Sequence, residues 1–276
     1  MEDKKKHVFF ISDGTGLTAE VVGETLLTQF PDIQFERTIL PYVKNPDEAH
    51  KAVFEIKKLQ QASGEFPLVF STMVDDELRK IIATSGAQVF DLFAAFINPL
   101  EKILGSHSVH KKGRMHGIRD YDDYHYRVNA LNFSLNHDDG LSHQSLLKAA
   151  VIIIGVSRCG KTPTELYMAM QFSIKAANYP LIEEDLEKEK LPDMLRPYKN
   201  KLVGLNIKAD QLSRIRQQRR PNSTYASLKQ CKKEIQQALG IFNTEEIPYL
   251  DTSSISIEEI ATRIVQIVKL HRPGYR

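Results

Sequence analysis

A glycine-flanked loop near the middle of the chain has the residue types that hold phosphate groups. Residues 155–162 read GVSRCGKT and match the pattern G-x-x-x-x-G-K-[ST] at every fixed position. A β-branched apolar run precedes this loop, and a helical pattern follows it. In such an arrangement backbone N–H groups turn toward an anion, and the helix N-terminus adds unpaired donors and a positive dipole. The predicted phosphate-binding residues are Gly155, Val156, Ser157, Arg158, Cys159, Gly160, Lys161 and Thr162.

Two side chains of this loop are expected to take part in phosphoryl transfer. Lys161 would bring a mobile positive charge to the terminal phosphates, and the Thr162 hydroxyl would ligate a Mg²⁺ ion that bridges them. Arg158 would either touch phosphate or point to solvent. Cys159 would be redox-sensitive if the helix N-terminus lowered the pKa of its thiol, and otherwise an inert loop residue. The alternative for the whole motif is a glycine-rich turn with an exposed lysine.

Phosphoryl transfer also needs a carboxylate, which holds Mg²⁺ or orients the acceptor hydroxyl. Asp138 and Asp139, in the sequence HDDG, come just before the strand that leads into the loop. Adjacent carboxylates ahead of a glycine suit a turn that projects them into a cleft, and an ordinary Asx turn is the alternative. These two residues are therefore our candidates for the catalytic base. Four other acidic residues at strand or loop ends are further candidates for this carboxylate, and for them a helix start or cap is the alternative. They are Glu183, Glu184, Asp185 and Asp251.

A basic stretch further along the chain could supply cations to the transferring group. Residues 211–233 contain seven lysines and arginines and no acidic residue. Four of the arginines fall on a helix turn before Pro221 and resemble the phosphate-facing arginines of P-loop kinases; an exposed basic helix is the alternative. Nucleic-acid binding is disfavoured, because the stretch has few aromatic residues and the formal net charge of the chain is only +2. The candidate phosphate-binding residues are Arg214, Arg216, Arg219 and Arg220.

Two further loops have distinctive compositions. Residues 105–119 are basic and contain histidines, but they lack the partner cysteine or H-E-x-x-H pattern of a zinc site. We expect this loop to dock an acidic or phosphorylated partner through Lys111, Lys112 and Arg114. The sequence ISDGTGLTAE meets the pattern G-x-G-x-x-A, although the acidic residue expected at the end of the second strand is missing. It predicts a tight turn that could bind an anion, with Asp13 as a candidate site residue.

The overall composition limits the class of protein. The chain has 276 residues, of which 42% are hydrophobic and 26% are charged, as in a globular protein of one large or two ordinary domains. Its two cysteines, Cys159 and Cys231, match neither a disulfide framework nor a metal-binding spacing and fit a reducing compartment. No apolar span of about 18 residues is present. We expect a cytoplasmic homo-oligomer that binds neither membranes nor nucleic acid.

Strand-like and helical patterns alternate along the chain, which predicts parallel sheets covered by helices. Residues 97–140 interrupt this alternation, which then resumes. We therefore predict an α/β protein with a Rossmann-like parallel-sheet unit, residues 1–145, followed by a P-loop kinase-like α/β domain, residues 146–276. The expected strands are 7–12, 35–43, 66–72, 87–93, 148–157, 179–182, 201–207 and 247–253, and the expected helices are 17–30, 47–61, 75–85, 162–177, a zone ending at Leu239, and 256–270.

The order and spacing of several motifs are similar to those of one known family. These motifs are ISDGTG, HDDG, GVSRCGKTPT, ANYP and RRPNSTYASLKQC. Over nearly its full length the chain resembles the bacterial and plastid regulatory proteins of pyruvate, phosphate dikinase and of phosphoenolpyruvate synthase. The form GVSRCGKTPT together with NYPLI looks like the phosphoenolpyruvate synthase branch.

This resemblance implies a bifunctional enzyme. One activity would be an ADP-dependent serine/threonine kinase that inactivates phosphoenolpyruvate synthase by phosphorylating a threonine beside its catalytic histidine. The other would be a phosphorylase that removes this phosphate with inorganic phosphate and releases pyrophosphate. Residues 155–162 would bind ADP and Mg²⁺. The alternatives are the same activities on pyruvate, phosphate dikinase, a small-molecule P-loop kinase, and a nucleotide-sensing module without catalysis.

Overall fold

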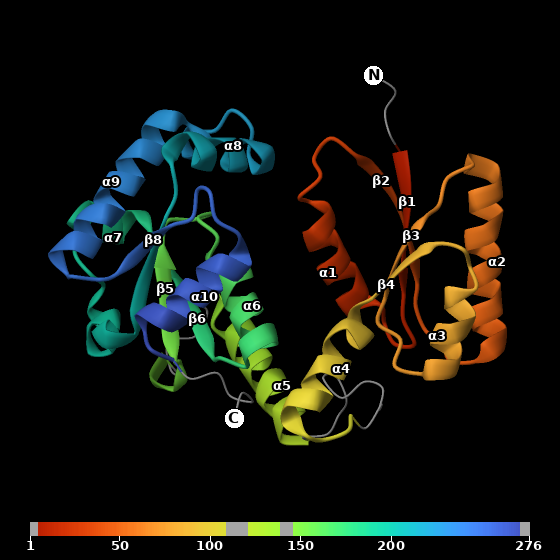
Figure 1. The fold of residues 1–276 in the computed structure, drawn as a ribbon. Helices are drawn as coiled ribbons and strands as arrows, with labels where there is room; N and C mark the ends of the chain where they lie inside the picture. Colours follow the sequence, from red (N-terminus) through yellow and green to blue (C-terminus); the bar gives the residue numbers. More distant parts are fainter. Residues whose placement is uncertain (1–4, 109–120, 139–145, 271–276) are drawn as a thin grey trace. The chain divides into compact units, whose positions relative to one another are not determined.

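A computed structural model describes residues 5–108, 121–138 and 146–270 of the chain. The chain divides into two compact units, Met1–Gly117 and Ile118–Arg276. Within the described residues, each unit contains one sheet of four parallel strands with helices against it (Figure 1). The predicted α/β class is confirmed.

The first unit has helices on both faces of its sheet. Its elements are β1 (Lys5–Ile11), α1 (Leu17–Leu27), β2 (Gln34–Leu40), α2 (Pro46–Ser63), β3 (Leu68–Ser71), α3 (Asp76–Ala83), β4 (Gln88–Asp91) and α4 (Leu92–Leu104). The strand order is β2-β1-β3-β4, with α1 on one face and α2 and α3 on the other (Figure 1). Val8 and Phe10 of β1 pack on the α1 side, and Phe9 and Ile11 pack on the α2 and α3 side. This alternation follows from the two-residue period of a strand.

Helix α1 approaches the sheet closely at a glycine. A Cβ atom added to Gly23 would lie 2.5 Å from the Phe10 ring, so any larger residue would push α1 away from the sheet. Gly16, which caps the N-terminus of α1, has a φ of +81°, in the left-handed region that favours glycine. The turn SDGTG therefore leads directly from β1 into a helix that lies tightly on the sheet.

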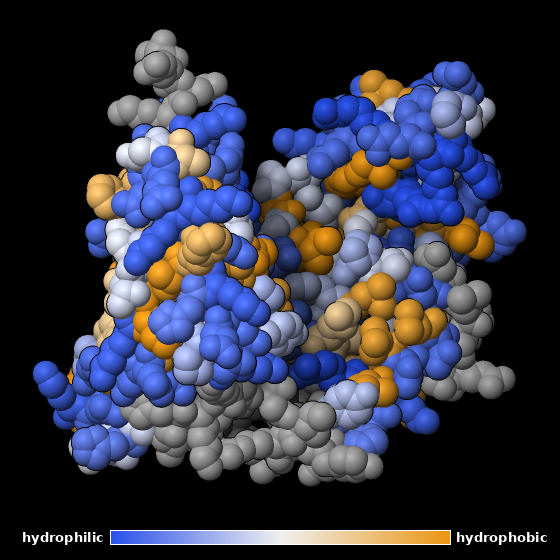
Figure 2. Space-filling model, turned by 90° about the vertical axis from the view of Figure 1, so that its right-hand side faces the viewer, coloured by the Kyte–Doolittle hydropathy of each residue, from blue (hydrophilic) through white to orange (hydrophobic). Residues whose placement is uncertain are grey.

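Helix α4 exposes large apolar side chains. Phe96 is 67% exposed and Ile103 is 79% exposed, and Leu100 and Leu104 are exposed as well. Figure 2 shows that hydrophobic residues gather in patches among hydrophilic ones on the face that it draws. Exposed apolar patches are common where a protein meets a partner.

The second unit is built around a fully buried central strand. Its elements are α5 (Tyr121–Asn136), η2 (Leu146–Lys148), β5 (Val151–Gly155), α6 (Lys161–Phe172), β6 (Ala176–Pro180), α7 (Glu183–Lys188), η3 (Asp193–Lys201), β7 (Leu202–Asn206), α8 (Ala209–Arg219), η4 (Thr224–Ala226), α9 (Leu228–Thr244), β8 (Tyr249–Asp251) and α10 (Ile257–Ile267). The strand order is β6-β5-β7-β8. Every residue of β5 is buried, as expected for a strand covered on both faces. The loop that follows β5 therefore leaves the middle of the sheet.

Several boundaries differ from the sequence-based expectation. Strand β6 occupies residues 176–180 rather than 179–182. The expected strand ended too late because Leu181 is an apolar core residue, although it lies beyond the ladder. The helical zone after β7 is divided into α8, η4 and α9, and α9 continues past Leu239 to Thr244. Residues 92 and 93, expected to end the strand 87–93, instead begin α4, which covers residues 92–104. The expected solvated helix start at residue 183 is confirmed, since α7 begins there.

Helix α5 packs against α6 and β6 and so goes with the second unit. The division into two domains, residues 1–145 and 146–276, stays a prediction. In the described part of the chain, no helix has both the length and the apolar character needed to cross a membrane.

Candidate functional site

The glycine-flanked loop joins the buried strand β5 to helix α6. A Cβ atom on Gly155 would lie 2.6 Å from the Leu205 carbonyl oxygen and 2.8 Å from the Cys159 sulfur. Gly160 has a φ of +99° and caps the N-terminus of α6. Because one position has no room for a side chain and the other has a left-handed backbone, this path of the chain requires both glycines. The unpaired N–H groups at the start of α6 therefore lie at the end of the central strand.

Lys161 is almost completely buried at the start of α6. Its ammonium donates a hydrogen bond of 3.0 Å to the Val156 carbonyl oxygen, and only 4% of the residue is exposed. None of the ion pairs among the described residues includes Lys161. A buried ammonium is costly unless an opposite charge compensates it, so this position favours a bound anion.

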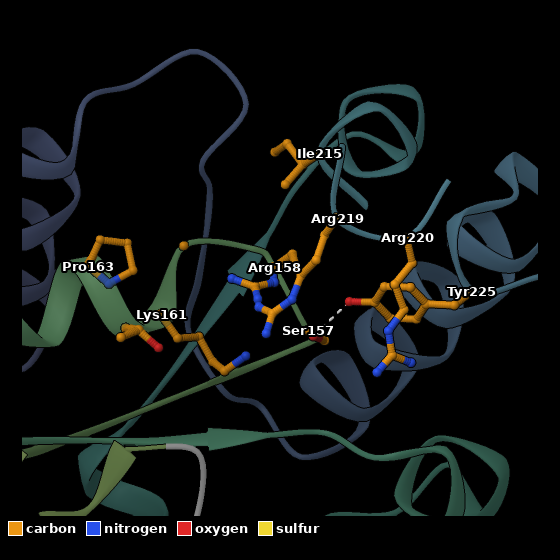
Figure 3. A pocket seen from close by; sticks show the side chains of 10 residues that line it. Ser157, Arg158, Lys161, Pro163, Ile215, Arg219, Arg220 and Tyr225 are labelled. Carbon is orange, nitrogen blue, oxygen red and sulfur yellow. Dashed lines mark hydrogen bonds between the residues drawn. The ribbon is translucent and has the colours of Figure 1, made fainter. Parts of the chain in front are cut away.

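A cavity of about 460 Å³ opens beside the loop (Figure 3). Four cationic side chains line it, and no described residue of its lining is acidic. In the view of Figure 3, Arg158 and Arg219 lie between Lys161 on one side and Arg220 on the other. The cavity combines a helix N-terminus with concentrated positive charge and can therefore bind a polyphosphate. Its lining consists of Ser157, Arg158, Gly160, Lys161, Thr162, Pro163, Ile215, Arg219, Arg220 and Tyr225.

The four arginines predicted to bind phosphate have different surroundings. Arg219 and Arg220 line the cavity. Arg214 is exposed and pairs with Asp210 at 3.1 Å, one helical turn away. Arg216 is completely buried behind the loop. The structure therefore brings two of the four to the predicted phosphate site.

Arg216 holds the loop from behind. Its guanidinium donates to the carbonyl oxygens of Ser157 at 3.1 Å and Tyr225 at 3.0 Å, and to the Glu234 carboxylate at 2.6 Å. It also stacks 4.1 Å from the centre of the Tyr225 ring. Burial by itself disfavours the charge, but the hydrogen bond and negative charge of Glu234 outweigh it and raise the pKa of Arg216. This residue ties α8 and α9 to the phosphate loop.

Asp138 lies beside the start of α6. It accepts hydrogen bonds from the Thr162 hydroxyl at 2.9 Å and from the Asn178 amide at 2.5 Å. The Asn178 amide also donates to Glu165 at 2.7 Å, and both residues are buried. The turn after α5, strand β6 and helix α6 thus meet at one polar cluster. Asp139 lies outside the described residues.

Sequence reasoning missed two members of this cluster. Glu165 follows Thr162 by three residues, so helical spacing could have placed the two on one face of α6. Asn178 had no comparable signal, because it is a single polar residue in a short strand. Its position beside Thr162 depends on the pairing of Asn178 with Ile153 of β5, which the register of the sheet sets.

Other candidate residues have structural partners. Asp13 is buried and accepts a hydrogen bond of 3.1 Å from the Val74 backbone, which connects the loops after β1 and β3. Asp251 accepts from the Ser253 backbone at 2.9 Å, as in a local cap. Residues 109–120, which include the basic residues of the predicted docking loop, lie outside the described part of the chain.

The C-terminal end of the sheet also supports the loop. The Thr252 hydroxyl lies 3.2 Å from the Cys159 carbonyl oxygen and 3.0 Å from the Asn206 carbonyl oxygen. Together with the bond from Arg216 to Ser157, this contact fixes two carbonyl groups of the loop from outside.

Both thiols should react slowly in the folded protein. Cys159 is 1% exposed and Cys231 is 0% exposed, and burial raises the pKa of both thiols. For Cys159 this is opposite to the lowering that a redox-sensitive thiol requires, so the inert alternative is favoured. We expect Ellman's reagent at pH 7 to label neither thiol rapidly in native protein and to label both in denaturant. Rapid native labelling of Cys159, mapped by mass spectrometry, would contradict this assignment.

Comparisons with known proteins show which family this chain is similar to. Residues 8–265 match the family described as Kinase/pyrophosphorylase. A protein of Legionella pneumophila (strain Lens) is 49% identical over 97% of this chain and 99% of its own length. Proteins of Azoarcus sp. (strain BH72) and Marinobacter nauticus are 51% and 48% identical over 97% of this chain, and the matches span 97% and 99% of those proteins. All three have the provisional name phosphoenolpyruvate synthase regulatory protein.

Proposed function

Because the chain belongs to the kinase/pyrophosphorylase family, we propose that it phosphorylates a threonine of phosphoenolpyruvate synthase with ADP and removes the phosphate with inorganic phosphate. Family membership makes the chain an enzyme of the kinase/pyrophosphorylase type, which acts on nucleotide and phosphate. The names of the relatives support phosphoenolpyruvate synthase as the regulated protein. The choice of ADP and of threonine rests on the motif resemblance described above. Pyruvate, phosphate dikinase is the alternative target.

The two reactions differ in which oxygen attacks phosphorus. In the kinase direction the threonine oxygen attacks the β-phosphorus of ADP, the bond to the bridging oxygen breaks, and AMP leaves. The hydroxyl proton passes to a base. In the reverse direction an oxygen of inorganic phosphate attacks the phosphothreonine phosphorus and forms the P–O–P bond of pyrophosphate. The bond to the threonine oxygen breaks, and this oxygen takes up a proton to become the hydroxyl again. Both steps place negative charge on the same transferring group, so one set of cations can serve both.

The cationic cavity is the observation that carries this proposal. Lys161, Arg158, Arg219 and Arg220 bring positive charge to a site at the N-terminus of α6, with no acidic residue in the described lining. We propose that Lys161 stabilises charge on the transferring phosphoryl group and that the arginines hold the other phosphate oxygens. The cavity and the buried parallel strand before it support the P-loop kinase-like assignment of the second unit, and the SDGTG turn supports the Rossmann-like assignment of the first.

The oxygen donors beside Thr162 fit a magnesium ion. A hydroxyl and a carboxylate are hard ligands of the kind that Mg²⁺ prefers, and Thr162 and Asp138 present both at the start of α6. When bound, Mg²⁺ would neutralise phosphate charge. We propose that Thr162 ligates the ion, that Asp138 orients the Thr162 hydroxyl, and that Asn178 fixes Asp138. Asp138 and Asp139 both remain sequence-based candidates for the base.

Asp138→Asn should weaken Mg²⁺ binding, so the variant should be less active than wild type at low Mg²⁺ concentration. The amide oxygen can still accept the hydrogen bond from Thr162, but the negative charge is lost. Loss of such an outer partner typically costs about 10- to 100-fold in metal affinity or activity. We expect the half-saturating Mg²⁺ concentration to rise, and calorimetry should show that Mg²⁺ strengthens ADP binding less than in wild type. Asp193→Asn, which removes an exposed carboxylate, is the control, and an unchanged Mg²⁺ response of Asp138→Asn would contradict its role.

The proposed function can be tested directly with purified phosphoenolpyruvate synthase. The enzyme, the target, Mg²⁺ and either ADP or ATP are incubated, and the modified residue is mapped by mass spectrometry. We expect a phosphothreonine and AMP with ADP as donor. Addition of inorganic phosphate to the modified target should release pyrophosphate and restore the unmodified threonine. A labelled small molecule without a labelled protein would instead favour a metabolite kinase.

We also propose that the chain forms homo-oligomers. The exposed apolar residues of α4, above all Phe96 and Ile103, support this proposal. Sedimentation velocity over a range of protein concentrations tests it, and a monomer at all concentrations would reject it.

A further inference from the structure

A second cavity lies beside the phosphate cavity and has a different chemical character. Its volume is about 590 Å³, and it shares Ser157 and Tyr225 with the first cavity. The hydroxyl groups of these two residues are hydrogen-bonded at 2.9 Å, and Figure 3 draws this bond as a dashed line. The two cavities therefore adjoin at this pair of side chains.

The second cavity is apolar and acidic rather than basic. Leu181 and Leu186 form a buried apolar base, and Ile182 is 50% exposed at the edge. The charge of Arg216 is matched by Glu234, at 2.6 Å. Glu183 also lines the cavity, and it forms no ion pair with another described residue. An anionic phosphate chain is thus favoured in the first cavity, and a ligand with apolar and cationic groups in the second.

The order of residues along the loop indicates which part of the first cavity the terminal phosphate would occupy. Ser157 lies near the β5 end of the loop, whereas Lys161 and Thr162 begin α6. The Lys161 ammonium reaches back to the Val156 carbonyl oxygen, beside Ser157. This charge attracts the terminal phosphate, so the reacting phosphoryl group would lie toward the wall between Ser157 and Tyr225. An acceptor hydroxyl held in the second cavity would then lie close to that group, on the other side of the shared residues Ser157 and Tyr225.

We propose that the second cavity binds the polypeptide segment that carries the acceptor threonine. Apolar side chains of this segment pack on Leu181, Ile182 and Leu186, and a lysine or arginine near the threonine pairs with Glu183. The inference rests on the proposed function, because it requires a protein acceptor. It adds a binding site for that acceptor and a preference for positive charge close to the modified residue.

Charge reversal at Glu183 tests the ion pair. In Glu183→Lys we expect the apparent KM for phosphoenolpyruvate synthase to rise about tenfold or more, since close interfacial charge pairs have large coupling energies. The KM for ADP and the kcat at saturating target should stay near the wild-type values. Glu184→Lys is the matched control, because it makes the same charge change in the same first turn of α7 but lies outside the cavity. Its KM for the target should not change.

Photo-crosslinking locates the bound segment independently of the kinetics. A p-benzoylphenylalanine residue at position 182 should crosslink to peptides that contain the phosphorylated threonine, whereas the same residue at Met170, which is 52% exposed on α6, should not. Failure of the wild-type enzyme to phosphorylate the target would reject the proposed function and this inference together. With an active wild type, an unchanged target KM in Glu183→Lys or a crosslink from position 182 to a different region would overturn the inference alone.

Discussion

Lys161→Ala is expected to lower kcat by about 10²- to 10³-fold in both the kinase and the phosphorylase reactions. Removal of one preorganised charged or hydrogen-bonding group from a water-excluded site typically costs about 3–4 kcal/mol of transition-state stabilisation. Lys161 meets this condition because its ammonium is buried, faces the carbonyl oxygen of Val156 and has no described carboxylate partner. Both reactions should suffer, since both transfer a phosphoryl group at the same cations.

The fold of this variant should stay intact. A buried ammonium without an ion pair contributes little net stability, so we expect the free energy of unfolding to change by about 1 kcal/mol or less. Steady-state kinetics in both directions, together with urea unfolding, separate the two effects. Lys148→Ala, which removes an exposed lysine outside the cavity, is the control. A Lys161→Ala enzyme with near wild-type kcat would remove the central role that we give to this residue.

Arg216→Ala should destabilise the second unit by about 3–5 kcal/mol, the usual cost of breaking a buried ion pair by removing one partner. The change leaves Glu234 without its cation and the carbonyl groups of Ser157 and Tyr225 without their donors. Urea unfolding measures this effect. The affinity for ADP should also fall, because the phosphate loop loses the side chain that holds it.

Two further variants distinguish a buried pair from a surface pair. Arg214→Ala removes an exposed arginine from the same helix, and its pair with Asp210 should be worth about 0.3–0.5 kcal/mol. The double variant Arg216→Met, Glu234→Leu removes both buried charges and should recover part of the lost stability. If Arg216→Ala were no less stable than Arg214→Ala, Arg216 would not hold the loop in the way that we describe.

The sequence predicted the path of the glycine-flanked loop, from a buried strand into a helix, because the signal for it is local. Two glycines, a lysine and a threonine at fixed spacing, between an apolar run and a helix, require no knowledge of distant residues. Strand β5 was predicted for the same reason, since a parallel strand buried on both faces is a continuous run of β-branched residues. Its neighbour β6 was misplaced because Leu181 and Ile182 extend the apolar pattern past the end of the ladder.

The rest of the site depends on contacts between distant parts of the chain. Arg216 and Arg219 belong to one basic run, yet one is buried on Glu234 and the other lines the cavity. Helical spacing gave a partial signal, because Arg216 follows the buried Leu212 by four residues and shares its face. The partner at residue 234 and the meeting of Asp138 with Asn178 arise only when α8 packs on α9 and α5 packs on β6.

Hydrogen bonds hold the carbonyl groups of Ser157 and Cys159 in place, so a nucleotide that binds as we propose would meet a loop whose backbone is already ordered. Little chain entropy is then lost on association, so more of the contact energy remains as affinity. Substitution of Arg216 or Thr252, neither of which needs to touch the ligand, would leave the unbound loop less ordered. Binding would then cost more chain entropy, so the affinity would fall.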